Sequence, residues 1–203
     1  MSQGPGFASP GPAGLGALAV VCFGFGAAFT GKVPLEGLLL LAAWLFGGCL
    51  IQIVTSIIEL KEGNLTGGNI MLFFSAFFMF SSGLGMIAKF VMITMGMVPS
   101  VVIEGYLWAG AAAFLTICTP AYARQNAIMF VLVIVVDVIL WMLAGIDTNI
   151  LPATYKHPLG YALFGVGIVG IYMSGAAMVN TVYGKMLLPI PAAVSKQSPN
   201  KAA

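Results

Sequence analysis

The chain has 203 residues, of which 60% are hydrophobic and only 7% are charged, and its mean hydropathy is +1.04. A soluble domain of this length would carry about 25% charged residues, because its surface must be hydrated. The net charge of only +2, without a run of basic residues, argues against binding to nucleic acid. The composition therefore predicts an integral membrane protein without a separate soluble domain.

Six apolar runs, bounded by charges, prolines and glycines, predict six transmembrane helices. A helix of roughly 20 residues is long enough to cross the hydrocarbon core of a bilayer. The predicted helices cover residues 13–29, 35–58, 69–88, 101–118, 127–145 and 158–182. We therefore expect an all-α membrane protein that consists of an N-terminal segment (1–12), a transmembrane domain (13–190) and a disordered polar tail (191–203).

An even number of spans places both ends of the chain on the same side of the membrane. The basic residues on that side are Lys61, Arg124, Lys185, Lys196 and Lys201, and those on the other side are Lys32, Lys89 and Lys156. Because basic residues are enriched in cytoplasmic loops, this excess favours cytoplasmic ends in a plasma (inner) membrane.

The sequence has no pattern typical of catalysis or of metal binding. Its one histidine, His157, lies in a predicted loop beside Lys156 and Pro158. A single histidine cannot supply a metal site or a Ser–His–Asp triad with the acids that are present. The sequence also lacks an HExxH motif, a P-loop and a GxGxxG motif. We therefore expect neither an enzyme nor a bound cofactor or metal.

Polar side chains within or next to the apolar runs are better candidates for a site, because charges in hydrocarbon are costly. Asp137, in the middle of the fifth span, would be a proton or substrate relay, or a neutral acid bonded to a neighbouring helix. Gln52 and Glu59 share one face of the second span, although Glu59 could also be a solvated acid at the helix end. Asn180 lies in the sixth span. Asn64 follows the second span, where turn formation is the alternative.

The segment 9–15 precedes the first apolar run and contains two prolines and two glycines. Its residues are Ser9, Pro10, Gly11, Pro12, Ala13, Gly14 and Leu15. The first helix should therefore begin at or after Pro12, with free amide groups pointing outward. Such helix starts attract anions in transporters. The alternative is an ordinary helix start with proline in its first turn.

Small residues recur along one face of the sixth span. They are Gly160, Gly167, Gly170, Ser174 and Ala177. A stripe of this kind lets a neighbouring helix approach closely. We expect the stripe to contact either another helix of the same chain or a second protomer.

Three ordered motifs resemble one known family. Residues 48–67 read GCLIQIVTSIIELKEGNLTG, which is similar to the GG-x-x-Q-x-x-x-G-x-x-E-x-K-x-GN-x-x-G signature of the acetate uptake transporter family, including the bacterial succinate–acetate permeases. The signature is matched at Gln52, Glu59, Lys61, Gly63, Asn64 and Gly67. Residues 9–15 resemble the family's NPAPLGL segment. Residues 157–190 resemble the family without a gap, including Asn180.

The resemblance implies a six-helix protomer in a ring-shaped homo-hexamer, with one pore per protomer for acetate and related short carboxylates, succinate included. It also implies a hydrophobic constriction built from the first, third and fifth helices. By position, this constriction would contain Leu18, Phe74, and either Val133 or Val135. In the same reading, the segment 9–15 would attract the anion. The polar residues that would hydrogen-bond the solute or handle a proton are Gln52, Glu59, Asn64, Asp137 and Asn180.

The sequence departs from the family pattern at several positions, among which Ser9, Gly11, Ala13, Leu18 and Phe74 replace an asparagine, an alanine, a leucine, an aromatic residue and a tyrosine. These departures concern solute selectivity more than fold. The sequence thus predicts a channel or proton symporter for acetate or another small monocarboxylate. Two alternatives stay open: a pore for neutral solutes such as urea or short amides, and a membrane scaffold without transport activity.

Overall fold

The computed structural model describes residues 7–194, and within this range it is helical with no β-strand. Its elements are α1 (Gly11–Phe29), α2 (Gly37–Lys61), α3 (Leu65–Phe74), the π-helix η1 (Ser75–Ser81), α4 (Ser82–Thr94), α5 (Val102–Tyr122), α6 (Ala127–Asp147), the 3-10 turn η2 (Ala153–Tyr155) and α7 (Lys156–Tyr183). Six of the resulting helical segments are long and apolar enough to cross a membrane. This confirms the predicted class, an all-α integral membrane protein with six spans.

Several boundaries differ from those predicted. The first helix begins at Gly11, with Pro12 in its first turn. The third span extends over Leu65–Thr94, because α3, η1 and α4 follow one another without a break. The fourth span, α5, continues through Pro120 to Tyr122 instead of turning after Cys118. Proline removes one backbone hydrogen bond, but membrane helices tolerate this loss. The predicted disorder of the tail falls largely on residues 195–203, which lie outside the described residues, as do residues 1–6 of the N-terminal segment.

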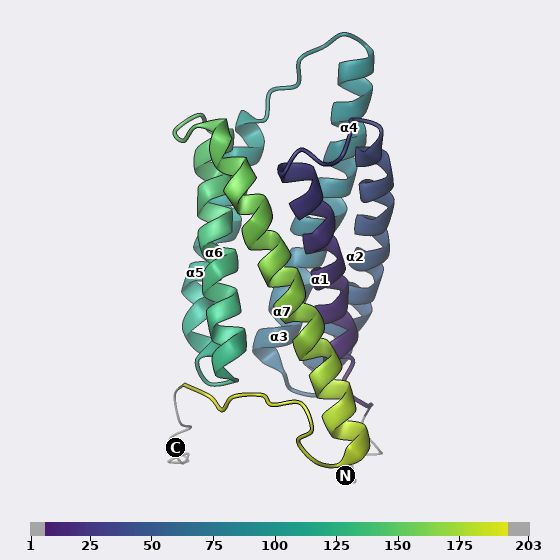
Figure 1. The fold of residues 1–203 in the computed structure, drawn as a ribbon, viewed down its shortest axis with the longest axis vertical. Coiled ribbons are helices and arrows are strands. Elements are labelled where there is room, and N and C mark those ends of the chain that lie inside the picture. The colour runs from purple at the N-terminus through teal and green to yellow at the C-terminus, as the bar shows by residue number, and fades with distance from the viewer. Residues whose placement is uncertain (1–6, 195–203) are drawn as a thin grey trace.

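The helices form a bundle in which consecutive spans are antiparallel (Figure 1). The most extensive contacts join α1 to α7 and α5 to α6, and α2 lies against α1, α3 and α4. The first and last described segments lie at the same end of the bundle (Figure 1). There the amide of Phe7 donates to Glu62 Oε1 after α2, and the amide of Ala127 donates to the carbonyl of Ala192. We refer to this as the terminal end of the bundle.

Small residues allow α1 and α7 to pack closely. A Cβ atom on Gly160 would lie 2.9 Å from the carbonyl oxygen of Gly26, and one on Gly167 would lie 3.1 Å from that of Ala19. Ser174, on the same stripe, donates to the carbonyl of Pro12 over 2.6 Å. The stripe of small residues on α7 therefore contacts a helix of its own chain, which is the first of the two arrangements that the sequence allowed.

The third span contains seven π-helical residues, Ser75–Ser81, in its middle. A π-turn holds more residues than an α-turn, so it changes the direction in which the following side chains point. Phe74 directly precedes the segment and Phe78 lies within it, and both rings are buried with centroids 6.4 Å apart. The π-helix thus adjoins the part of the span that faces the interior of the bundle.

Candidate functional site

An internal cavity of about 80 Å³ lies between the helices. A cavity of about 10–15 Å³ holds one water molecule, so this cavity has room for a solute of a few heavy atoms. Its lining residues are Gly14, Leu15, Leu18, Cys22, Gln52, Ile70, Met71, Phe74, Phe78, Leu115, Tyr122, Met129, Leu132, Val133, Val136, Ile139, Leu140 and Leu163. Of the residues that the structure describes, no charged one lines the cavity. The wall is almost entirely apolar.

The cavity is elongated along the bundle axis. On α6 it extends from Met129 to Leu140, a length of about 16 Å at the rise of an α-helix. Leu18, Phe74 and Val133 all line it. Val135 does not line it and is 36% exposed on the outside of α6. Of the two valines named from the sequence, the structure therefore brings only Val133 together with Leu18 and Phe74.

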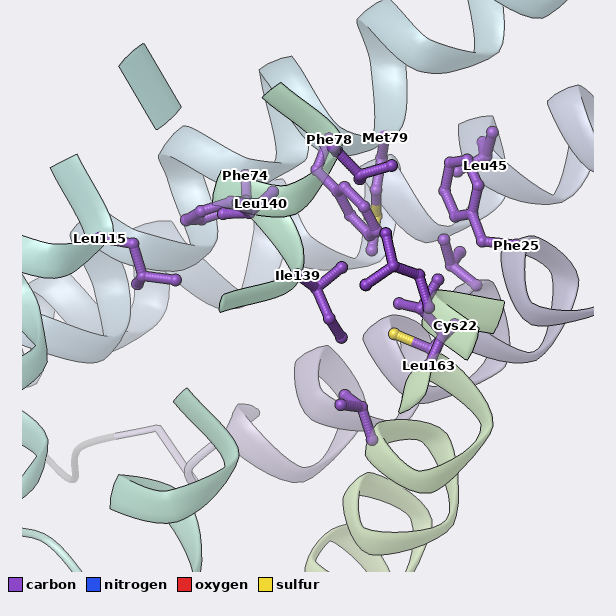
Figure 2. Packing of buried hydrophobic residues seen from close by; sticks show 14 of the residues in the cluster. Cys22, Phe25, Leu45, Phe74, Phe78, Met79, Leu115, Ile139, Leu140 and Leu163 are labelled. Carbon is purple, nitrogen blue, oxygen red and sulfur yellow. The ribbon is translucent and has the colours of Figure 1, made fainter. Parts of the chain in front are cut away.

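Aromatic side chains gather at the end of the cavity that is farther from the terminal end. The ring of Phe78 lies 5.0 Å from that of Phe25 and 6.3 Å from that of Trp108. Figure 2 shows Phe74, Phe78 and Phe25 beside Cys22 and other apolar side chains in the interior of the bundle. Any solute that left the cavity in this direction would pass between packed rings.

Of the described residues that line the cavity, Gln52 is the one with an amide side chain. Its side chain is 2% exposed, and Nε2 donates to the carbonyl oxygen of Gly14 over 3.3 Å. Because the nitrogen points to that carbonyl, Oε1 points elsewhere, and it is buried without a hydrogen-bond partner among the described residues. A buried acceptor without a donor is costly, so a ligand that supplies one would be stabilised here.

Other polar residues of α2 contact the start of α1 instead of the cavity. Thr55 Oγ1 lies 3.5 Å from the carbonyl oxygen of Pro10, to which it donates. The carboxylate of Glu59, which is 7% exposed, accepts hydrogen bonds from Ser9 Oγ over 2.7 Å and from the side chain of Asn64. Glu59 is therefore neither a solvated acid nor a cavity residue. It joins the beginnings of α1 and α3.

The amides at the start of α1 already have partners. The amide of Gly11 donates to Ser9 Oγ, those of Ala13 and Gly14 donate to the carbonyl of Pro10, and Pro12 has no amide hydrogen. The Glu59 carboxylate also lies at this helix start, where negative charge is favoured. The geometry thus gives an ordinary helix start with an internal anion, and it does not favour attraction of a solute anion by segment 9–15.

Asn64 and Asn180, the two asparagines predicted to line the pore, have structural contacts and do not line the cavity. Asn64 caps α3, since its Oδ1 accepts from the amide of Gly67 over 3.1 Å. Asn180 holds the chain that follows α7, because its side chain bonds the amides of Leu187 and Leu188 and the carbonyl of Leu188. Both contacts fit the turn and capping roles of this residue type.

Asp137 lies on α6 at the seam with α5, and it does not line the cavity. Both of its carboxyl oxygens lie within hydrogen-bond distance of Thr116 Oγ1, at 3.0 and 2.8 Å. Thr116 Oγ1 also accepts from Trp141 Nε1 over 3.0 Å and lies 2.9 Å from the carbonyl of Ala112. This is the second arrangement that the sequence allowed, an acid bonded to a neighbouring helix.

Because Asp137 faces the α5–α6 seam, we expect Asp137→Asn to leave solute flux within about twofold of the unchanged protein. Asparagine keeps the shape and the hydrogen bond to Thr116, so the fold should lose at most about 1 kcal/mol. Flux into reconstituted vesicles and the thermal midpoint in detergent measure both effects. A collapse of flux in a correctly folded Asp137→Asn protein would instead identify this acid as a relay.

Sequence reasoning missed three features. Tyr122 lines the cavity, although Pro120 made its segment read as a turn. At the end of the bundle opposite the terminal end, Lys89 pairs with Glu104 at 2.6 Å and Lys156 with Asp147 at 2.9 Å. Oppositely charged residues near the ends of successive spans were the available signal for these pairs. Within residues 7–194 no group of three or more potential metal ligands occurs.

The fold and the cavity define a class: a six-span helical membrane protein with an apolar cavity inside the helix bundle. No protein-family model matches the sequence, and no curated protein matches it. The fold is similar to that of the bacterial acetate channel SatP, with a TM-score of 0.78 and 21% sequence identity over 91% of this chain and 99% of that chain. The chain therefore has the fold of an acetate channel over nearly its whole length. This likeness supports the relation to the acetate uptake transporter family that the motifs indicate.

Proposed function

We propose that the protein is a membrane channel or permease for acetate and related short monocarboxylates, and that the internal cavity is the route of the solute. The observation that carries the proposal is the uncharged, solute-sized cavity inside a protomer that shares its fold with an acetate channel. Internal cavities with a few polar groups on an apolar wall are typical of small-molecule sites.

In this proposal Leu18, Phe74 and Val133 form the constriction, and they exclude water and hydrated ions. An ionised carboxylate loses far more solvation free energy in apolar surroundings than a neutral acid does. The solute therefore crosses the constriction together with a proton, as the protonated acid. Gln52 offers it an amide in an otherwise apolar wall.

Uptake of labelled acetate into reconstituted vesicles should become faster when the external pH falls below about 6. At pH values above the pKa of a weak acid, its protonated fraction rises about tenfold for each unit by which the pH falls. Only the protonated form crosses the apolar constriction at a low desolvation cost. The flux of a solute that does not titrate, such as urea, serves as the control for effects of pH on the protein. An acetate rate independent of external pH would rule out proton-linked passage.

One observation favours a second candidate function, a channel for neutral solutes such as urea or short amides. Among the described residues no charged side chain lines the cavity, and Phe74 lines it without a hydroxyl group. Direct flux measurements discriminate the two functions, because a channel for neutral solutes would carry labelled urea faster than labelled acetate at neutral pH. A scaffold without transport activity would show no flux for any member of a panel of acetate, formate, lactate, succinate and urea.

We also propose that the protomers assemble into a homo-hexamer in the inner membrane, with the terminal end in the cytoplasm. The hexamer is supported by the motif resemblance. The orientation is supported by the distribution of lysine and arginine between the two ends of the spans.

A further inference from the structure

Tyr122 contributes a hydroxyl-bearing side chain to the cavity wall. It is the last residue of α5, its side chain is 5% exposed, and it lines the cavity. Within residues 7–194 its hydroxyl makes no hydrogen bond. Side chains on a helix point toward the helix N-terminus, so the ring of Tyr122 is directed from the terminal end of the bundle toward its middle.

Gln52 lines the same cavity from α2. Its amide nitrogen donates to the carbonyl of Gly14. Gly14 lies three residues after the start of α1, about 4.5 Å along the helix axis from its first residue. Met129 lines the same part of the cavity from the first turn of α6, just as Tyr122 does from the last turn of α5. The cavity wall therefore contains two polar side chains, Tyr122 and Gln52, and the amide oxygen of Gln52 is buried without a hydrogen-bond partner among the described residues.

We infer that Tyr122 and Gln52 form a docking pair for an uncharged solute that carries a hydrogen-bond donor and an acceptor on the same carbon. The Tyr122 hydroxyl donates to the carbonyl oxygen of the solute, and Gln52 Oε1 accepts its O–H or N–H. Protonated carboxylic acids and primary amides have this pattern. This inference rests on the proposed function, because it assumes that the cavity is the route of the solute.

Other charge states and groups satisfy the pair only in part. A carboxylate accepts from Tyr122 but has no donor for Gln52 Oε1, and no cation lines the described cavity to compensate its charge. A ketone has an acceptor and no donor. The free-energy penalty of a buried acceptor without a partner exceeds the net gain from one hydrogen bond. The pair therefore selects solutes that carry a hydrogen-bond donor.

The test combines one conservative substitution with two competing solutes in reconstituted vesicles. Tyr122→Phe removes only the hydroxyl, and Tyr106→Phe, in the same helix but 68% exposed, is the matched control. We expect acetamide to compete with labelled acetate at low pH, and acetone, which lacks a donor, to compete much less. We expect Tyr122→Phe to lower acetate uptake and the potency of acetamide by a similar factor of about five. Tyr106→Phe should change neither.

Three outcomes would overturn the inference. They are acetate uptake without competition by acetamide, equal competition by acetamide and acetone, and a Tyr122→Phe protein that behaves like the Tyr106→Phe control. In each of them acetate still crosses, so the proposed function stands and only the docking pair is lost. Absence of acetate flux in the unchanged protein would instead refute the proposed function, and the docking pair with it.

Discussion

Gly160→Val should strongly destabilise the bundle. The added Cβ atom would lie 2.9 Å from the carbonyl oxygen of Gly26 and 3.1 Å from the amide of Thr30, and both are backbone atoms that cannot move aside like a flexible side chain. Helices α1 and α7 would have to separate along their longest contact. Overpacking of this kind costs about 1–3 kcal/mol or more. The thermal midpoint of the detergent-solubilised protein measures the loss.

Gly165→Val is the matched control for this change. Gly165 lies in the same helix, and a Cβ atom at this position would have no heavy atom within 4 Å. Both substitutions replace glycine by valine within α7, so they change the helix propensity equally. The difference between the thermal midpoints of the two variants therefore reports the α1–α7 contact alone. Equal midpoints for the two proteins would show that the close approach of α1 and α7 does not exist.

Val133→Phe should nearly abolish solute flux while the protein stays folded. Val133 lines the cavity beside Leu18 and Phe74, and the cavity measures only about 80 Å³, so a phenyl ring would fill a large part of it. We expect the initial rate of acetate uptake to fall at least about tenfold, which corresponds to a barrier increase of about 1.4 kcal/mol or more. Unchanged elution in size-exclusion chromatography would show that the fold persists.

Two neighbours on α6 supply the controls. Val131 is 57% exposed and Val135 is 36% exposed, and neither lines the cavity. Val131→Phe and Val135→Phe should therefore transport acetate at the unchanged rate. If Val135→Phe blocked flux and Val133→Phe did not, Val135 would be the constriction residue of the fifth span. The cavity would then not be the route.

The spans could be predicted from the sequence because lipid imposes a simple rule on the backbone. A segment that crosses hydrocarbon must satisfy its own hydrogen bonds and must be apolar over its length, and both properties are visible in single runs of residues. The stripe of small residues on α7 was visible for a similar reason, because a repeat of Gly160, Gly167 and Gly170 identifies one helix face. Which helix this face contacts was not visible.

The site could be predicted only in part, because the direction of a side chain depends on residues far away in the chain. In α6 almost every residue is apolar, so no polar face showed that Asp137 points to Thr116 instead of the cavity. One of the two partners of Glu59 is Ser9, fifty residues earlier. Tyr122 was missed because Pro120 was taken as the end of a helix that in fact continues.

The π-helical segment Ser75–Ser81 acts as a spacer that sets the rotation of α4 relative to α3. Removing one residue from it would let the wide turn close to an ordinary α-turn, so residues 82–94 would keep their direction. The same deletion in α3, where no wide turn can absorb it, would turn the following residues by about 100° around the helix axis and direct Lys89 away from Glu104. In this span the π-helical segment is therefore the place where a change in chain length is best tolerated.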